Sequence, residues 1–521
     1  MKKALSIPLL CLALSGLGSC SDFLDRDPDG IMTPGDIRLE KDILNALNGT
    51  YRALILDRNQ PFCQDFMGDD AYCNDPGYGE LLIWKMEQTP SDMKYTLDKW
   101  SRNYEGILRA NTVIAYAPGV HFDDASLRAR YIAEALVLRA YFYADLIDFY
   151  GDVPFRTEPE GLKKRISPRV DRQNVMMNIL MDLDNAVGDL PKTYRNPADH
   201  GRVTQGAALA LKARICLYNK RWDWAVEACR EVIGLGVYDL HPSYRELFTP
   251  AVEKTNKEYI LTQQYVAGKD SEGLSGIFWT KLSAYGAFQI AHNLVEEYRM
   301  TDGRRYDDPL SGYTDTAPYA NRDPRLLYTV KVDAVADMSG TSHTGYKAQK
   351  FVDDAANPDK IHRNDEVDFP LIRYADVLLM LAEALVEKGE YDYDEVTGLV
   401  DRIRQRGDVR MPTVAEAEER FAGRRLTREE LREAIRHERR VEFPLEGLRY
   451  SDIRRWEIGP EALGDCYAIR KVTDDTDPDD ITTRYEKVLF MKRTFNAAKG
   501  YLWPVPAIEI QTNPMPQNPG Y

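Results

Sequence analysis

Two stretches of this 521-residue chain combine aromatic side chains with short polar ones in segments that lack helical periodicity. Sugar recognition uses this chemistry: a flat ring packs against the C–H face of a pyranose, and carboxylates or amides exchange hydrogen bonds with its hydroxyl groups. The alternative is that the rings pack between loops and helices, since tryptophan is buried on average. The candidates are Trp84, Tyr72, Tyr78, Asn74, Asp69 and Asp70 in the first stretch, and Trp279 and Tyr285 in the second.

The sequence contains few patterns that are typical of a catalytic site. His437-Glu438-Arg439-Arg440-Val441 lacks the second histidine of a zinc protease helix. The better interpretation is an ion-pair network of Arg436, Glu438, Arg439, Arg440 and Glu442, with Arg454 and Arg455 nearby in sequence. No GxSxG, P-loop, GxGxxG or CxxC pattern occurs. The acidic stretch 474–482 is a weak candidate for calcium, because it lacks the glycine and glutamate of an EF-hand, and a solvated loop is favoured. We therefore predict a protein that is not an enzyme and needs no cofactor.

The N-terminus has the features of an export signal. Two lysines precede an apolar run, Ala4 to Leu17, that is too short to span a bilayer. The run ends in Leu17-Gly18-Ser19-Cys20, which resembles the lipobox of bacterial lipoproteins; the alternative is an ordinary cleavage site beside a chance cysteine. We expect residues 1–19 to be removed, Cys20 to carry the lipid anchor, and residues 20–35 to form a flexible tether.

Composition limits the partners. The formal net charge is −15, and −17 once the two N-terminal lysines are removed, which argues against nucleic acid or anionic lipid. Past the signal, no apolar run approaches the ~20 residues of a membrane-spanning helix. The five cysteines beyond Cys20 are sparse and odd in number, so they cannot form a disulfide framework. Cys63 and Cys73 could form one bridge or remain two buried thiols.

Helical periodicity dominates the remainder. In YIAEALVLRAYFYADLIDFYGDVPF, residues 131–155, apolar side chains recur at helical spacing until Gly151 and Pro154 end the run. Residues 204–236 and 375–405 each indicate two helices around a short break, with alanine where the helices cross. These hairpins resemble tetratricopeptide repeats. The sequence therefore predicts an all-α fold of stacked helical hairpins with long loop-rich insertions.

The insertions divide the chain. Residues 60–100 and 237–370 are rich in Gly, Pro, Asp and Tyr, and excursions of this length in a helical body are usually functional. We expect an N-terminal helical region over residues 36–236 and a C-terminal region over residues 237–521.

Five motifs, in order along the chain, resemble the SusD/RagB family of lipoproteins. They are AEALVLRAYFYADLIDFYGDVPF (133–155), EEYRMTDGRRYDD with NRDPRLLYTV (296–330), FPLIRYADVLLMLAEAL (369–385), LREAIRHERRVEFPLEGLRYSDIRRW (431–456) and the C-terminal YLWPVPAIEIQTNPMPQNPGY. The aspartate-rich stretch after Cys20 also resembles the surface-export signal of Bacteroidota lipoproteins.

The resemblance implies a fold and a function. The fold would be the SusD-like α-α superhelix. The protein would be lipid-anchored on the outer face of the outer membrane, where it partners a SusC-like TonB-dependent transporter, binds glycans and passes them inward without catalysis. Trp84 and Trp279 fall where the ligand-binding loops of the family lie.

Three alternatives remain open at this stage. One keeps the family but replaces the glycan by a peptide or a glycoprotein-derived ligand. Another is a lipidated repeat scaffold that binds no small ligand, which a deep apolar groove on the repeats would favour. An enzyme ranks last, because no catalytic motif was found.

Overall fold

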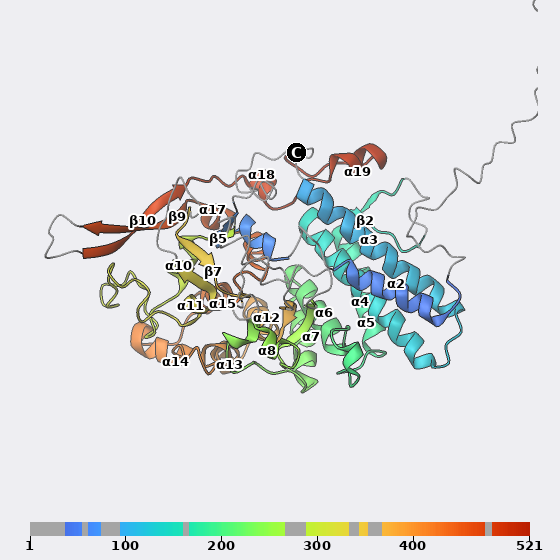
Figure 1. Cartoon of the computed structure of the whole chain (residues 1–521), viewed down its shortest axis with the longest axis horizontal. Helices are drawn as coiled ribbons and strands as arrows, with labels where there is room; N and C mark the ends of the chain where they lie inside the picture. Colours follow the sequence, from blue (N-terminus) through green and yellow to red (C-terminus); the bar gives the residue numbers. More distant parts are fainter. Residues whose placement is uncertain are drawn as a thin grey trace, which may run out of the picture.

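The computed structural model describes residues 37–54, 61–73, 94–159, 166–265, 288–332, 343–352, 367–474 and 482–521. Over these residues helices dominate and strands occur only in short pairs, which confirms the predicted all-α class (Figure 1). The signal, Cys20 and the tether lie outside the described residues.

A stack of helices, the helical stack, fills one end and the centre of the molecule (Figure 1). Each helix packs on the next along the chain, and α7 packs on α12 across a long intervening segment. The hairpins predicted for 204–236 and 375–405 are therefore confirmed as members of one interrupted stack. Its members are α2 (Glu40–Arg52), α3 (Lys94–Tyr116), α4 (Ala125–Tyr150), α5 (Arg172–Val187), α6 (Gln205–Tyr218), α7 (Trp222–Gly234), α12 (Tyr374–Lys388) and α13 (Tyr393–Arg404).

Helix α4 shows how the sequence sets these boundaries. The Asp124 carboxylate accepts a hydrogen bond from the backbone N–H of Ser126 at 2.8 Å, satisfying a donor that the first turn leaves free. At the other end Gly151 has φ +71° and donates its N–H to the Ile147 carbonyl. Few residues other than glycine adopt this conformation readily, so the predicted end of the helix is confirmed.

Small residues allow the helices to approach closely. A Cβ atom on Gly106 of α3 would lie 2.4 Å from the ring of Phe142 on α4, well inside contact distance. Glycine is therefore the residue that fits this crossing, and the two helices bury their facing side chains.

The other end of the molecule, the strand-bearing half, carries short helices and antiparallel strand pairs, including the long β9–β10 hairpin (Figure 1). The strands are β1 (Ala71–Cys73) with β5 (Phe288–Ile290), β4 (Tyr259–Gln263) with β8 (Phe369–Arg373), β6 (Val330–Val332) with β7 (Tyr346–Ala348), and β9 (Cys466–Asp474) with β10 (Thr482–Met491); β2 (Val153–Pro154) pairs with β3 (Arg169–Val170) beside the stack. Helices outside the stack are α8 (Pro250–Glu253), α10 (His292–Glu297), α11 (Arg325–Thr329), α14 (Val414–Ala417), α15 (Arg428–Glu442), α16 (Arg449–Arg455), α17 (Gly459–Ala462), α18 (Ala497–Gly500) and α19 (Ala507–Thr512). Short turns of other helical type include η1 (Pro61–Met67).

A buried ion-pair network joins this half to the stack. Glu442 of α15 pairs with Arg373 and Arg406 at 2.8 and 2.9 Å, and Arg439 pairs with Asp376 of α12 at 2.7 Å. The predicted network around His437 is confirmed, although most of its partners come from distant parts of the chain. Because each of these charges is paired, their burial is tolerated.

Candidate functional site

The β1–β5 pair joins the described residues that flank the two stretches that sequence analysis selected. Cys73, the last residue of β1, is the register partner of Phe288, the first residue of β5. Opposed residues of an antiparallel pair lie about 5 Å apart. The segment 74–93, which leaves β1, and the segment 266–287, which enters β5, therefore start and end at adjacent points. The core fixes this junction, since the Phe288 ring packs on Phe66 at 4.8 Å.

A cluster of rings, the aromatic base, lies beside this junction: Tyr72, His343 and Phe490. Tyr72 alternates with two buried neighbours on β1 and so faces the other side of the strand. Its ring meets Phe490 of β10 edge-on at 4.8 Å and lies 6.0 Å from His343. All three side chains are half-buried, and His343 follows a third segment, 333–342.

The electrostatics of the aromatic base suit neutral hydrogen bonding. Burial raises the pKa of Tyr72, so its hydroxyl stays protonated at neutral pH and keeps the ability to donate and accept. A phenol that remains neutral can exchange hydrogen bonds with hydroxyl groups while its ring offers an apolar edge.

A row of tyrosines continues from the base toward the β9–β10 hairpin. Tyr319 lies between Tyr346 and Tyr485, with ring centroids 6.3 and 5.8 Å away. The Tyr346 hydroxyl contacts His292 Nδ1 at 2.8 Å. Burial lowers the pKa of His292 to about 4, so this histidine is neutral at physiological pH. Tyr346 is fully buried, so only the half-buried Tyr319 and Tyr485 of this row are partly exposed.

Two sequence profiles match this chain: one described as the SusD family, over residues 331–521, and one described as starch-binding associating with outer membrane, over residues 22–217. The SusD-like protein P2 of Formosa agariphila is 26% identical over the whole of both chains. The SusD-like protein P38 of the same organism is 26% identical over 89% of this chain and 94% of its own length. The chain belongs to the SusD/RagB family.

Solved structures of SusD-like proteins share the architecture. A SusD-like carbohydrate binding protein from Bacteroides fragilis superimposes with a TM-score of 0.78 at 25% identity, over 91% of this chain and 98% of that one. A laminarin binding SusD-like protein superimposes with a TM-score of 0.68 at 24% identity, over 93% of this chain and 100% of that one. The predicted SusD-like fold is therefore confirmed.

Asp69 and Asp70 do not lie at the surface of this SusD-like protein. Both side chains are buried. Arg440 of α15 forms ion pairs with Asp69 and Asp70 at 2.8 Å each. Arg449 donates two hydrogen bonds of 2.8 and 2.9 Å to the Asp69 carboxylate. The expectation of two loop carboxylates open to a ligand is corrected: paired guanidinium groups make burial favourable, and the pair fixes the start of β1.

These contacts set opposite pKa values for the two carboxyl groups. Burial acts to raise the pKa of Asp69, but Arg440 and Arg449 outweigh it and hold that pKa well below its usual range. Burial raises the pKa of Asp70 to about 6 despite Arg440, and the negative charge of Asp69 adds to the rise. One oxygen of Asp70 makes no hydrogen bond among the described residues.

Several predicted residues lie outside the described part of the chain. They are Trp84, Trp279, Tyr78, Tyr285, Asn74 and Cys20, together with residues 475–481 of the calcium candidate. Tyr72 alone of the predicted aromatic residues is described, and it belongs to the aromatic base.

Sequence reasoning missed His343 and Phe490. Phe490 belongs to TRYEKVLFM, a stretch of β-branched and aromatic residues typical of a strand, and this signal was available. His343 had no local signal, because its partners Tyr72 and Phe490 are distant in sequence.

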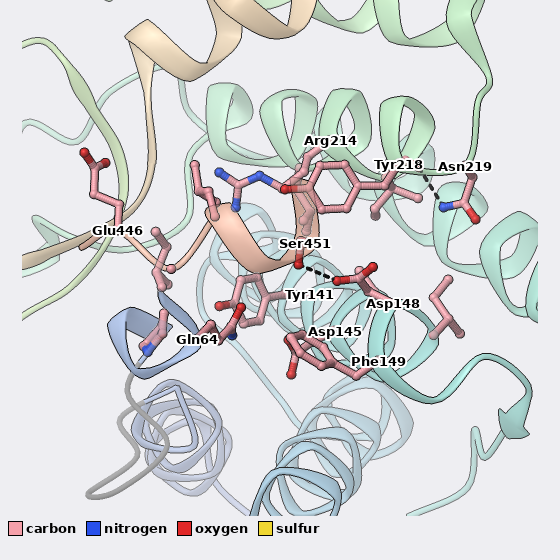
Figure 2. A pocket seen from close by; sticks show the side chains of 18 of the residues that line it. Gln64, Tyr141, Asp145, Asp148, Phe149, Arg214, Tyr218, Asn219, Glu446 and Ser451 are labelled. Carbon is pink, nitrogen blue, oxygen red and sulfur yellow. Dashed lines mark hydrogen bonds between the residues drawn. The ribbon is translucent and has the colours of Figure 1, made fainter. Parts of the chain in front are cut away.

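A cavity between η1, α4, α6 and α16 is a weaker candidate site (Figure 2). Its volume is about 90 Å³, room for a few water molecules and well below the ~300 Å³ at which ligand pockets begin. Its polar groups serve structure: Ser451 donates to Asp148 at 2.7 Å (Figure 2). Arg214 pairs with Asp376 at 2.7 Å. The cavity therefore marks a polar seam between the stack and the C-terminal helices.

The histidine of the HERRV stretch is also structural. His437 is largely buried, and its Nε2 lies 2.8 Å from the Glu297 carbonyl oxygen. Burial and the nearby Arg299 lower the pKa of His437 to about 4. Among the described residues, no three His, Cys, Asp or Glu side chains gather as metal ligands would.

Cys63 and Cys73 are both buried and form no disulfide, so the alternative of a bridge between them is not realised. Burial raises the pKa of Cys63 well above its ordinary value, which leaves the thiol unreactive. Within the described ranges, no helix has the length and apolar character needed to cross a bilayer.

Proposed function

We propose that this SusD/RagB protein binds oligosaccharides at the aromatic base and passes them to a SusC-like TonB-dependent transporter in the outer membrane. Cys20 would carry the lipid that holds it on the outer face. The observation that carries the proposal is the aromatic base of half-buried Tyr72, His343 and Phe490, of which Tyr72 belongs to the β1–β5 pair.

Family membership supports a saccharide as the ligand. A relative 25% identical over most of both chains is named a SusD-like carbohydrate binding protein. The half-buried ring of Tyr72, whose hydroxyl remains neutral, suits the mixed apolar and hydroxyl-bearing surface of a sugar. Trp84 and Trp279, which lie outside the described residues, remain candidates for stacking platforms.

Binding without turnover is the second part of the proposal. A glycoside hydrolase needs two carboxyl groups placed on either side of the scissile bond. The adjacent pair nearest the base, Asp69 and Asp70, is buried against Arg440 and Arg449 instead. These carboxylates position β1 and do not reach a ligand.

The test compares two neighbouring residues of β10. Phe490 belongs to the aromatic base, whereas Leu489 is exposed and is not part of the base. The purified protein is first screened against neutral α- and β-linked gluco-oligosaccharides and against a tryptic peptide digest. For the best saccharide, Phe490→Ala should weaken the affinity three- to tenfold, since a ring contact contributes about 0.5–1.5 kcal/mol. Leu489→Ala should bind normally.

The same screen separates the alternatives. Binding of peptides but of no saccharide would favour the peptide-binding branch of the family. Saccharide binding that is equal in both variants would place the site away from the aromatic base. Turnover of a bound saccharide that disappears with a point mutation would contradict a purely binding role.

A further inference from the structure

A groove, the basic groove, lies between the loop before α6 and strand β4, in a different sheet from the aromatic base. Residues 192–204 form one wall and residues 254–265 the other. Its volume is about 610 Å³, inside the ~300–1,000 Å³ range of ligand sites. Where the walls meet, Gly201 has φ +83° and a Cβ there would lie 2.2 Å from the Gln264 side chain. The walls therefore approach as closely as glycine permits.

The charges that line the basic groove differ from those of the whole chain. Acidic residues number 83 of 521, so about three would be expected among 19 lining residues. None of the described lining residues is acidic. The groove instead presents Lys192, Arg202, Lys254 and Lys257. A positive groove in a protein of net charge −15 selects for a negative ligand.

Two of these cations are neutralised by the protein itself. Arg202 pairs with Glu134 at 3.0 Å, and Lys254 pairs with Asp368 at 2.6 Å. Lys192 and Lys257 are exposed and pair with no carboxylate of the described residues. These two ammonium groups supply the excess positive charge of the groove.

Tyrosine side chains give the groove a fixed shape. The Tyr194 hydroxyl donates to the Val203 carbonyl at 2.8 Å, and the hydroxyls of Tyr238 and Thr204 lie 2.9 Å apart. Tyr259 is held in the same way by a backbone carbonyl at 2.8 Å. Because these rings are already ordered, a ligand that contacts them loses little additional conformational entropy in the protein.

We propose that the basic groove binds an acidic oligosaccharide, one that carries carboxylate or sulfate groups, as a second saccharide site apart from the aromatic base. Its rings would contact the sugar, and Lys192 and Lys257 would pair with the anionic groups. The negative charge of the remaining surface does not prevent this, since charges beyond about 8 Å are largely screened at physiological salt. The inference requires neither a ligand at the aromatic base nor delivery to a transporter.

Calorimetric titration of the purified protein in 50 mM salt tests the assignment. The carboxylate probe is an oligogalacturonate of defined length, the sulfate probe is a sulfated galactan oligosaccharide, and laminarihexaose and a polyglutamate peptide are controls. The double variant Lys192→Ala/Lys257→Ala is compared with Lys41→Ala, an exposed lysine on α2. Thermal melts verify that each variant is folded, which the exposure of all three lysines favours.

At least one acidic saccharide should bind, and the double variant should weaken its binding at least tenfold while Lys41→Ala changes it less than twofold. Affinity should also fall at 300 mM salt, and the response to laminarihexaose should be the same in all variants. Which acidic probe binds identifies the anionic group. The proposal is overturned if neither acidic saccharide binds, if the double variant binds like the wild type, or if polyglutamate binds and the saccharides do not. Loss of laminarihexaose binding in Phe490→Ala concerns the aromatic base alone.

Discussion

The helical stack and the strand-bearing half are held together by contacts of different range. In the stack, helices pack mainly on their neighbours along the chain, and buried apolar side chains fill the interfaces. In the other half, Asp70 pairs with Arg440 across 370 residues, and β1 pairs with β5 across more than 200. The first region resembles a repeat array, in which nearest-neighbour interfaces dominate, and the second depends on closure of long loops.

This difference explains where the candidate sites lie. Segments released from a regular stack are free to vary, but their ends must be held for a ligand surface to persist. Buried ion pairs and two-stranded ladders hold those ends, as Arg440 and Arg449 do for the start of β1. The helical stack stabilises the fold, and the buried ion pairs and two-stranded ladders fix the positions of the segment ends.

The largest effect is expected when a buried ion-pair cluster that links distant parts of the chain is disrupted. Arg373 of β8 contacts Glu258, Glu442 and Glu446, and all four side chains are buried. Arg373→Met keeps the apolar stem but removes one positive charge from the cluster, in which Arg406 and Lys350 still pair with the three carboxylates. The uncompensated buried negative charge should lower the free energy of unfolding by about 3–5 kcal/mol. Urea denaturation followed by circular dichroism measures this loss.

The matched control for Arg373 is Arg305, an exposed arginine that pairs with Asp307. Arg305→Met should change stability by less than about 0.5 kcal/mol, because exposed ion pairs contribute little. If the two variants lost the same free energy of unfolding, the buried long-range ion pairs would stabilise the strand-bearing half no more than an exposed ion pair does.

An intermediate effect is expected in the stack. Gly106→Ala places a methyl group 2.4 Å from the Phe142 ring, so the α3–α4 crossing must open or the ring must shift. We expect destabilisation of about 1–3 kcal/mol, the usual range for overpacking. Gly398, in the exposed middle of α13, has no atom within 4 Å of an added Cβ. Gly398→Ala should stabilise the protein by about 0.5–1 kcal/mol in the same urea assay. Stabilisation by both substitutions would mean that α3 and α4 do not depend on a close approach.

The same division governs what the sequence could predict. The helical hairpins were predictable, because periodicity and the breaks at Gly151 and Gly389 are local signals. The β1–β5 and β4–β8 pairs and the burial of Asp69 were not, because their partners are distant in sequence. Asp69 in isolation has the character of a loop carboxylate, and only its position beside Arg449 changes that. Tyr72 was correctly selected as an aromatic candidate, but its neighbours His343 and Phe490 emerge only from the folded chain.

The smallest effect is expected in the pH dependence of the free energy of unfolding, which compares the strand-bearing half with the helical stack. His292 lies in α10 of the strand-bearing half, and burial lowers its pKa to about 4 in the folded protein, against about 6.5 when unfolded. The unfolded chain therefore takes up a proton first, and stability present above pH 6.5 is lost as pH falls toward 4. Between pH 7 and pH 5 this histidine should account for a loss of about 1–2 kcal/mol.

His292→Gln removes the titrating group while keeping a side chain able to hydrogen-bond the Tyr346 hydroxyl. Urea denaturation at pH 7 and pH 5 should show that the variant loses about 1–2 kcal/mol less stability than the wild type over this interval. His121, which is exposed near the start of α4, provides the comparison: His121→Gln should leave the wild-type pH dependence unchanged. If His292→Gln and the wild type lose the same stability on acidification, the protonated imidazole is accommodated in the fold, and the tyrosine row beside it is more open to water than its burial indicates. If only His292→Gln changes the loss of stability on acidification, acid destabilises the buried polar contacts of the strand-bearing half before it destabilises the helical stack.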